Sequence, residues 1–209
     1  MGGHGHAATR AATLIDIHGV GRMSLAHDPK APLLLVFGGV PVDFHDKGGE
    51  KTLSGVYMWN YLHKIQDRFH IFVAGSNDVE GAPAYRAVMK EVTGRKLTPS
   101  QQILYLFSGG YRPGMSVLTS FAANTFSSIF LVDIWMGTGK KHNDPSVPKF
   151  YKSLADANSA KMFYIHTSGG AENTDARDYI TNKLGPTRAP LVVTGGHMAT
   201  NITAVNMLP

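Results

Sequence analysis

The sequence predicts an α/β fold, a three-layer sandwich in which helices cover both faces of a mostly parallel central sheet. Three observations predict it. Short apolar runs recur along the chain, and most of them end in glycine. The runs 33–37, 103–107 and 129–132 are continuously apolar rather than alternating, which is typical of strands buried on both faces. Segments with helical periodicity separate the runs, and this alternation predicts right-handed crossovers between parallel strands.

The expected elements follow one another in a simple order. Residues 13–25 are expected to form an antiparallel edge strand or hairpin. The further strands are expected within 32–40, 70–76, 103–110, 128–137, 161–170 and 190–197. The helices are expected over 53–68, 83–93, 113–126, 148–158 and 174–184. Pro113 suits the first turn of its helix, where a missing N–H costs nothing, and Gly94 and Gly185 suit helix ends.

The length of the chain fits one domain. A chain of 209 residues buries roughly 70% of the surface of its unfolded state. Hydrophobic residues make up 43% of it and charged residues 17%, an ordinary globular composition. Residues 1–12 are small, polar and glycine-rich, so we predict a flexible leader there and a single α/β domain over 13–209.

Composition also excludes several kinds of chemistry and partner. The chain has no cysteine, which excludes disulfides, thiolate metal sites and a cysteine nucleophile. Its net charge is +5, but Lys and Arg are scattered, so no nucleic-acid partner is expected. No window approaches the roughly 18 apolar residues of a membrane span, and the start lacks the apolar stretch of a signal peptide. We therefore expect no membrane span and a cytoplasmic location as synthesised; the oligomeric state is not indicated.

The sequence lacks the common cofactor-binding and metal-binding motifs at the positions where this fold would place them. No G-x-G-x-x-G follows a strand, and neither GxxxxGK[ST] nor HExxH occurs. His142, Asn143 and Asp144 are adjacent in a predicted loop, where neighbours seldom converge on one ion. We expect neither a cofactor nor a metal.

The clearest local signal is the segment LYLFSGGYRPGM, in which a buried strand leads directly into Ser108 and a helix follows almost at once. A sharp strand-to-helix turn forces its middle residue into a strained backbone conformation and lifts that side chain above the sheet. The glycines that follow relieve crowding at such a turn. Taken alone, Ser108 is either an ordinary cap or turn residue or a nucleophile raised above the sheet.

This segment resembles the nucleophile elbow of the α/β-hydrolase superfamily, whose usual form is G-x-S-x-G. Gly110 fills the last small position, but Leu106 stands where the family prefers glycine or alanine. The superfamily carries its triad in the order serine, acid, histidine, with the histidine after the last strand. His197 directly follows PLVVTGG, the last strand-like run, so the resemblance implies that His197 is the general base.

The acid of the triad has three candidates. The resemblance places it in the loop after the penultimate strand, which makes Asp175 the first choice and Glu172 nearly equal to it. A known variation takes the acid from the preceding strand, which nominates Asp133 in FLVDIWMG. Asp175 as a helix cap and Asp133 as an acceptor for backbone donors are equally good structural interpretations.

An acyl-transfer site also needs donors for a developing oxyanion, usually two backbone N–H groups. One is expected from Gly109, directly after the nucleophile. The other is expected from the glycine-bearing loop after an early strand, at Gly39 and Val40. The resemblance therefore implies a compact serine esterase, acyl hydrolase or amidase that acts on a small-molecule or acyl substrate.

Two alternatives stay open at this point. A Rossmann-like or flavodoxin-like domain that binds a nucleotide or another small molecule would also place glycines at its strand ends. A hydrolase-fold binding protein without activity would explain the bulky Leu106. A further serine, Ser168 in HTSGG, has a context like that of Ser108, but His166 two residues earlier is not set up as its base.

Overall fold

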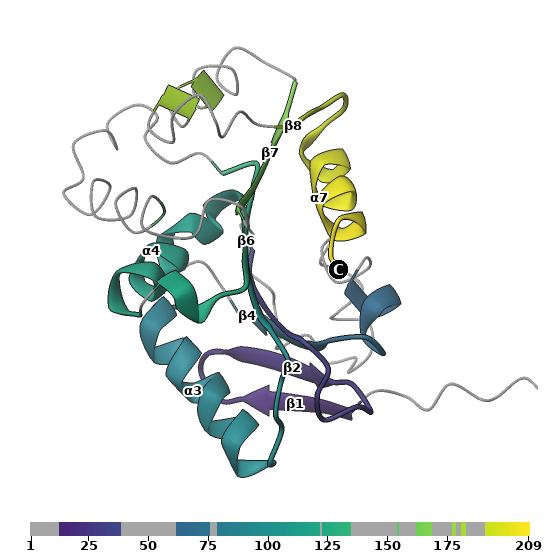
Figure 1. The fold of residues 1–209 in the computed structure, drawn as a ribbon. Coiled ribbons are helices and arrows are strands. Elements are labelled where there is room, and N and C mark those ends of the chain that lie inside the picture. The colour runs from purple at the N-terminus through teal and green to yellow at the C-terminus, as the bar shows by residue number, and fades with distance from the viewer. Residues whose placement is uncertain are drawn as a thin grey trace, which may run out of the picture.

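The computed structural model describes residues 13–38, 62–75, 79–121, 123–134, 154, 162–168, 177–178, 181–182 and 191–209. Within them, helices lie on both faces of one sheet (Figure 1). This confirms the predicted three-layer α/β architecture. The proposed leader, residues 1–12, lies outside the described residues, so the division of the chain into leader and domain stays a prediction.

The sheet has eight strands in the order β1-β2-β4-β3-β5-β6-β7-β8. Their bounds are β1 Thr13–Ile17, β2 Gly21–Leu25, β3 Leu33–Phe37, β4 His70–Ala74, β5 Gln102–Phe107, β6 Ser128–Val132, β7 Met162–Thr167 and β8 Leu191–Val193. β1 and β2 form the predicted antiparallel hairpin, and β2 joins β4 antiparallel. From β4 to β8 all neighbours are parallel. The carboxyl ends of six strands therefore meet at one edge.

Three helices cover the sheet within the part of the chain that the structure describes. α3 (Gly81–Gly94) and α4 (Tyr111–Ser120) lie on one face, and α7 (His197–Asn206) lies on the other (Figure 1). The short 3₁₀ segments are η1 His63–Ile65, η2 Ser108–Gly110 and η3 Ala123–Thr125. Most of each of the predicted helices over 148–158, 174–184 and 53–68 lies outside the described residues; residue 154 of the first and residues 177–178 and 181–182 of the second are described, and they are helical.

α4 differs from its prediction at both ends. It follows η2 directly and begins at Tyr111 rather than at residue 113. It ends at Ser120 rather than at residue 126, because Phe121 adopts an extended conformation, with φ −126° and ψ 147°. The Phe121 ring then packs edge-on against Tyr85 of α3, 4.5 Å between centroids. The early end of α4 thus comes with a contact between Phe121 and α3 that helical periodicity does not encode.

Alternate residues of the parallel strands enter two cores. Leu33, Leu35 and Phe37 of β3 join the core beneath α3 and α4. Leu34 and Val36 join the core that Ala204, Val205 and Leu208 of the α7 region close. All five β3 side chains are fully buried. The continuous apolar run in the sequence thus has the predicted cause, burial on both faces.

No helix within the described residues is both long and apolar enough to cross a membrane.

Candidate active site

The candidate site lies at the carboxyl edge of the parallel strands. β4 pairs with one side of β3 and β5 with the other, so the strand order reverses between β3 and β5. In open α/β sheets, ligands bind in the crevice outside the strand ends at this point. Ser108 directly follows β5 and therefore stands at this crevice.

Ser108 has the strained backbone that the sequence predicts. Its φ is +52°, in the left-handed region that side chains other than glycine rarely adopt. Phe107 before it is still extended, and Gly110 two residues later is already helical. The chain thus turns from strand to helix within three residues, with Ser108 half-buried at the turn. Such strain persists only where the surrounding structure enforces it, commonly at a functional site.

Two glycines make room for this turn. A Cβ on Gly110 would lie 1.9 Å from the carbonyl oxygen of Phe37, so only glycine fits against the end of β3. A Cβ on Gly114 of α4 would lie 2.4 Å from Cδ1 of Leu106, which is fully buried. The bulky Leu106 is therefore accommodated by a small residue on the helix that packs over it. Its departure from the superfamily pattern is compensated.

Substitution at Gly114 tests this compensation. We expect Gly114→Ala to destabilise the fold by about 1–3 kcal/mol through overpacking, and Leu106→Ala by about 2–5 kcal/mol through a cavity. In the double variant Leu106→Ala/Gly114→Ala, the smaller residue 106 makes room for the new methyl group. Its loss in free energy of unfolding should therefore be smaller than the sum of the two single losses by at least about 1 kcal/mol. Urea unfolding measures all three free energies.

Gly94→Ala is the matched control, because a Cβ on Gly94 meets no atom within 4 Å. It should leave the free energy of unfolding within about 0.5 kcal/mol of the starting value. Additive losses in the double variant would show that Leu106 and Gly114 do not share this space.

His197 lies beside the turn that carries Ser108. It is the first residue of α7, after β8, and its side chain is 32% exposed. Its ring stacks on Phe107, the residue before Ser108, with 4.3 Å between centroids and 27° between planes. The loop before it is anchored by the Thr167 hydroxyl, which donates to the carbonyl oxygen of Gly195 at 2.5 Å.

Asp133 is the carboxylate that meets His197. It directly follows β6, is fully buried, and has a φ of +47°. Its Oδ2 contacts Nδ1 of His197. Its Oδ1 accepts a hydrogen bond from the Thr167 backbone N–H at 3.1 Å and lies 3.1 Å from Nδ1 of His166. Among the described residues, the structure thus brings to His197 the carboxylate that the sequence nominated third.

The other predicted site residues divide between the described and undescribed parts of the chain. Asp175 and Glu172 lie outside the described residues, as do Gly39 and Val40. Gly109 lies in η2, half-buried, next to Ser108. The roles of these five residues in the candidate site stay predictions.

Comparison with solved structures identifies the fold. A predicted CIB-like hydrolase from Thermoplasma acidophilum superposes with a TM-score of 0.56 at 12% identity, over 94% of each chain. LpqC, a poly(3-hydroxybutyrate) depolymerase from Bordetella parapertussis, gives a TM-score of 0.51 at 12% identity, over 89% of this chain and 83% of that one. The chain has the α/β-hydrolase fold. No protein-family model and no curated protein sequence matches it.

The α/β-hydrolase fold replaces the Rossmann-like and flavodoxin-like alternatives. These folds share the reversal of strand order that forms a crevice, but not the hairpin of β1 and β2 joined antiparallel to β4 or the strained serine after the central strand. Each motif is weak on its own, but their order along the chain therefore predicted the correct fold.

A buried hydrogen bond, which sequence reasoning missed, ties the two halves of the candidate site together. The Tyr105 hydroxyl on β5 donates to Oδ1 of Asn201 on α7 at 2.6 Å. Burial raises the pKa of Tyr105 well above the ordinary tyrosine value, so the hydroxyl keeps its proton. Tyr105 lies three residues before Ser108 and Asn201 one helical turn after His197. The bond thereby holds α7 against the strand that carries the serine.

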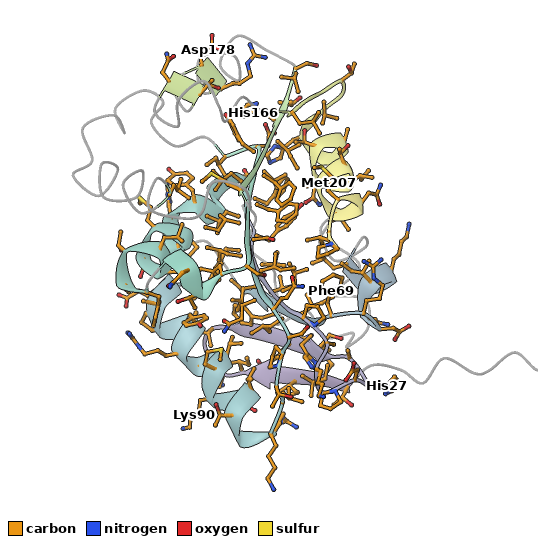
Figure 2. All side chains as sticks on the ribbon, viewed as in Figure 1. His27, Phe69, Lys90, His166, Asp178 and Met207 are labelled. Carbon is orange, nitrogen blue, oxygen red and sulfur yellow. The ribbon has the colours of Figure 1, made fainter. Side chains whose placement is uncertain are left out.

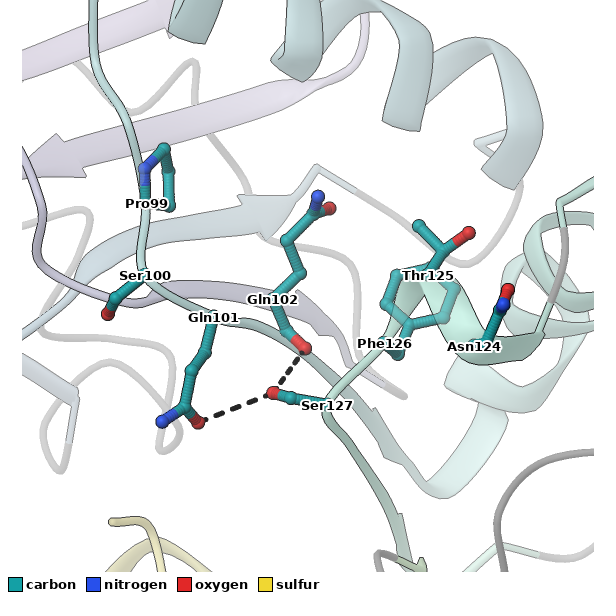
Figure 3. Close-up of a pocket in the computed structure, with 8 residues that line it drawn as sticks. All are labelled: Pro99, Ser100, Gln101, Gln102, Asn124, Thr125, Phe126 and Ser127. Atoms are coloured by element: carbon teal, nitrogen blue, oxygen red, sulfur yellow. Dashed lines mark hydrogen bonds between the residues drawn. The ribbon is translucent and has the colours of Figure 1, made fainter.

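The pocket in Figure 3 lies at the opposite edge of the sheet. It has a volume of about 340 Å³ and is lined by Pro99, Ser100, Gln101, Gln102, Asn124, Thr125, Phe126 and Ser127. Gln102 begins β5 and Ser108 follows its end, so the pocket is about 20 Å from the serine at roughly 3.3 Å per residue. It is not part of the candidate site. No group of three or more His, Cys, Asp or Glu side chains in the described part of the chain could hold a metal ion.

Proposed function

We propose that this protein is a serine hydrolase that cleaves an ester or amide bond in a small-molecule or acyl substrate, with Ser108, His197 and Asp133 as its triad. The observation that carries the proposal is the position of His197. Its Nδ1 contacts the Asp133 carboxylate, and its ring stacks on Phe107, the residue before the strained Ser108. The α/β-hydrolase fold and the hydrolases among its structural neighbours support it.

The chemistry follows from the contact between His197 and Asp133. The carboxylate accepts a hydrogen bond from the Nδ1–H of His197, which leaves Nε2 with the lone pair that a general base needs. As the Ser108 oxygen attacks the substrate carbonyl, Nε2 takes the hydroxyl proton. The same proton then goes to the departing alcohol or amine, and an acyl-serine forms. Water repeats the sequence, giving its proton to Nε2, and releases the acid and the free serine.

The developing oxyanion needs donors at the turn. In this proposal the Gly109 N–H is one donor, because it follows the nucleophile at the start of a helix, where N–H groups have no partner within the helix. The loop after β3, with Gly39 and Val40, supplies the second. Close packing of Gly110 on Phe37, the last residue of β3, supports this, since it brings the start of that loop to the turn.

Reaction with a fluorophosphonate tests the nucleophile. We expect one adduct per chain, located by peptide mass spectrometry on Ser108, because only a serine with a base in reach attacks phosphorus rapidly. Ser168→Ala is the matched control. Ser168 also follows a parallel strand, but its side chain is exposed, and the variant should label like the wild-type protein.

His197→Gln should lower the rate of labelling to near that of a free serine, since the base is lost. An adduct on Ser168, or no adduct at all in the wild-type protein, would contradict the proposed function.

A further inference from the structure

His166 is a second histidine on the Asp133 carboxylate, and the proposed reaction does not use it. It lies in β7 near the strand end and is fully buried (Figure 2). Its Nδ1 is 3.1 Å from Oδ1 of Asp133, while His197 contacts Oδ2. The two histidines therefore contact different oxygens of one buried carboxylate.

The neighbours of the His166 ring fix the position of its proton. Nδ1 lies 3.1 Å from the carbonyl oxygen of Thr167 and 3.1 Å from Oδ1 of Asp133, and both atoms only accept hydrogen bonds. Nδ1 must therefore carry a hydrogen. Nε2 is buried and has no hydrogen-bond partner among the described residues. The hydrogen on Nδ1 makes His166 a donor to the carboxylate.

We propose that His166 is a positioning residue for the acid of the triad. Together with the Thr167 N–H, it holds Oδ1 and so turns Oδ2 toward His197. It also withdraws negative charge from the carboxylate, which weakens the stabilisation of a protonated His197. The inference rests on the proposed function, because it assigns the role of His166 through the pair of Asp133 and His197.

A pH readout follows from this role. Among the described titratable side chains, Asp133 after β6 contacts His197, His166 of β7 contacts the same carboxylate, and the Tyr105 hydroxyl of β5 is bound to Asn201 of α7. β8 and the rest of α7 contribute none, and Arg68 lies at the far end, against the carbonyl oxygens of Leu208 and Pro209. Loss of the donor on Oδ1 leaves more negative charge for His197. The protonated form of His197 is then favoured, and its titration moves to higher pH.

Two substitutions separate the donor from the bulk of the ring. His166→Asn places an amide nitrogen near the position of Nδ1 and keeps the donor. His166→Gln places it near Nε2, where the described structure has no partner. We expect the Gln variant to raise the midpoint of the His197 titration, followed by NMR of the ring, by about 0.5–1 pH unit. Its kcat should fall about tenfold, while the Asn variant stays within about threefold of the wild-type kcat.

His70→Gln is the control for buried histidines in general. His70 begins β4, at the opposite edge of the sheet, is fully buried, and accepts a hydrogen bond from the Ala26 N–H at 3.2 Å. Burial lowers its pKa. Its substitution should lower the thermal midpoint and leave the His197 titration unchanged.

The possible results separate the inference from the function. An unchanged His197 titration in His166→Gln, or equal effects of Asn and Gln, would overturn the role of His166 even if Ser108 is labelled. Absence of labelling would contradict the function, while the NMR titration would still test the positioning. Should both variants fail to fold, the ¹⁵N shifts of the wild-type ring decide: a proton on Nδ1 of His166 supports the inference, and one on Nε2 overturns it.

Discussion

Ser108→Ala is expected to lower kcat for a short-chain aryl ester by about 10⁵–10⁶-fold, the scale on which removal of the nucleophile disables a serine hydrolase triad. The fold should persist, because the side chain is only half-buried and its hydroxyl adds little packing. Initial rates with an acetyl or butyryl aryl ester, together with a thermal unfolding curve, check both halves of this expectation.

Ser108→Gly separates catalysis from backbone strain at the same position. Ser108 has a φ of +52°, and glycine adopts such a conformation without strain. The Gly variant should therefore be as inactive as the Ala variant but more stable than it by about 1 kcal/mol. An Ala variant with wild-type activity would show that Ser108 is not the nucleophile. Equal stability of the two variants would show that the turn is not strained.

Asp133→Asn is expected to lower kcat by about 10⁴-fold while the protein stays folded. Asparagine keeps the shape of the side chain and tolerates the positive φ of 47° at this position. Its amide can still accept from the Thr167 N–H. The charge that stabilises a protonated His197 is lost, however, and an amide N–H facing Nδ1 of His197 favours the wrong tautomer for catalysis. Single-turnover and steady-state kinetics of the purified variant measure the loss.

Asp175→Asn and Glu172→Gln are the comparisons that decide the acid. If Asp133 is the acid of the triad, both variants should keep kcat within about threefold of the wild-type value, because neither removes the carboxylate that acts on His197. A loss of about 10⁴-fold in Asp175→Asn with a small effect of Asp133→Asn would move the acid to the loop after β7, as the superfamily pattern in the sequence first indicated.

The sheet could be predicted because its signals are local. A strand covered on both faces needs an apolar residue at every position, and the run 33–37 shows this in five consecutive letters. The turn at Ser108 could be predicted as well, since a strand, a serine, two glycines and a helix are neighbours in the sequence. The ends of the helices were harder to predict. Phe121 leaves α4 to pack on Tyr85, and this contact joins residues 36 positions apart.

The size of Leu106 was a correct observation, but it weakened the prediction of a nucleophile elbow at Ser108. Read alone, a bulky residue two positions before the serine counts against an elbow. In the folded protein, Gly114 supplies the missing space from the helix above it. The sum of the two volumes, and not the size of either residue, is what close packing constrains.

By itself, then, the sequence determined the three-layer α/β architecture, the strained turn at Ser108 and the place of His197 after the last strand. Each follows from burial or turn chemistry among residues close together in the chain. Only the tertiary structure brought the Asp133 carboxylate to His197. Asp133 lies 64 residues before it, and their contact depends on β6, β7 and β8 ending side by side. It likewise brought His166 to the same carboxylate, because strand register sets which side chains meet across a sheet.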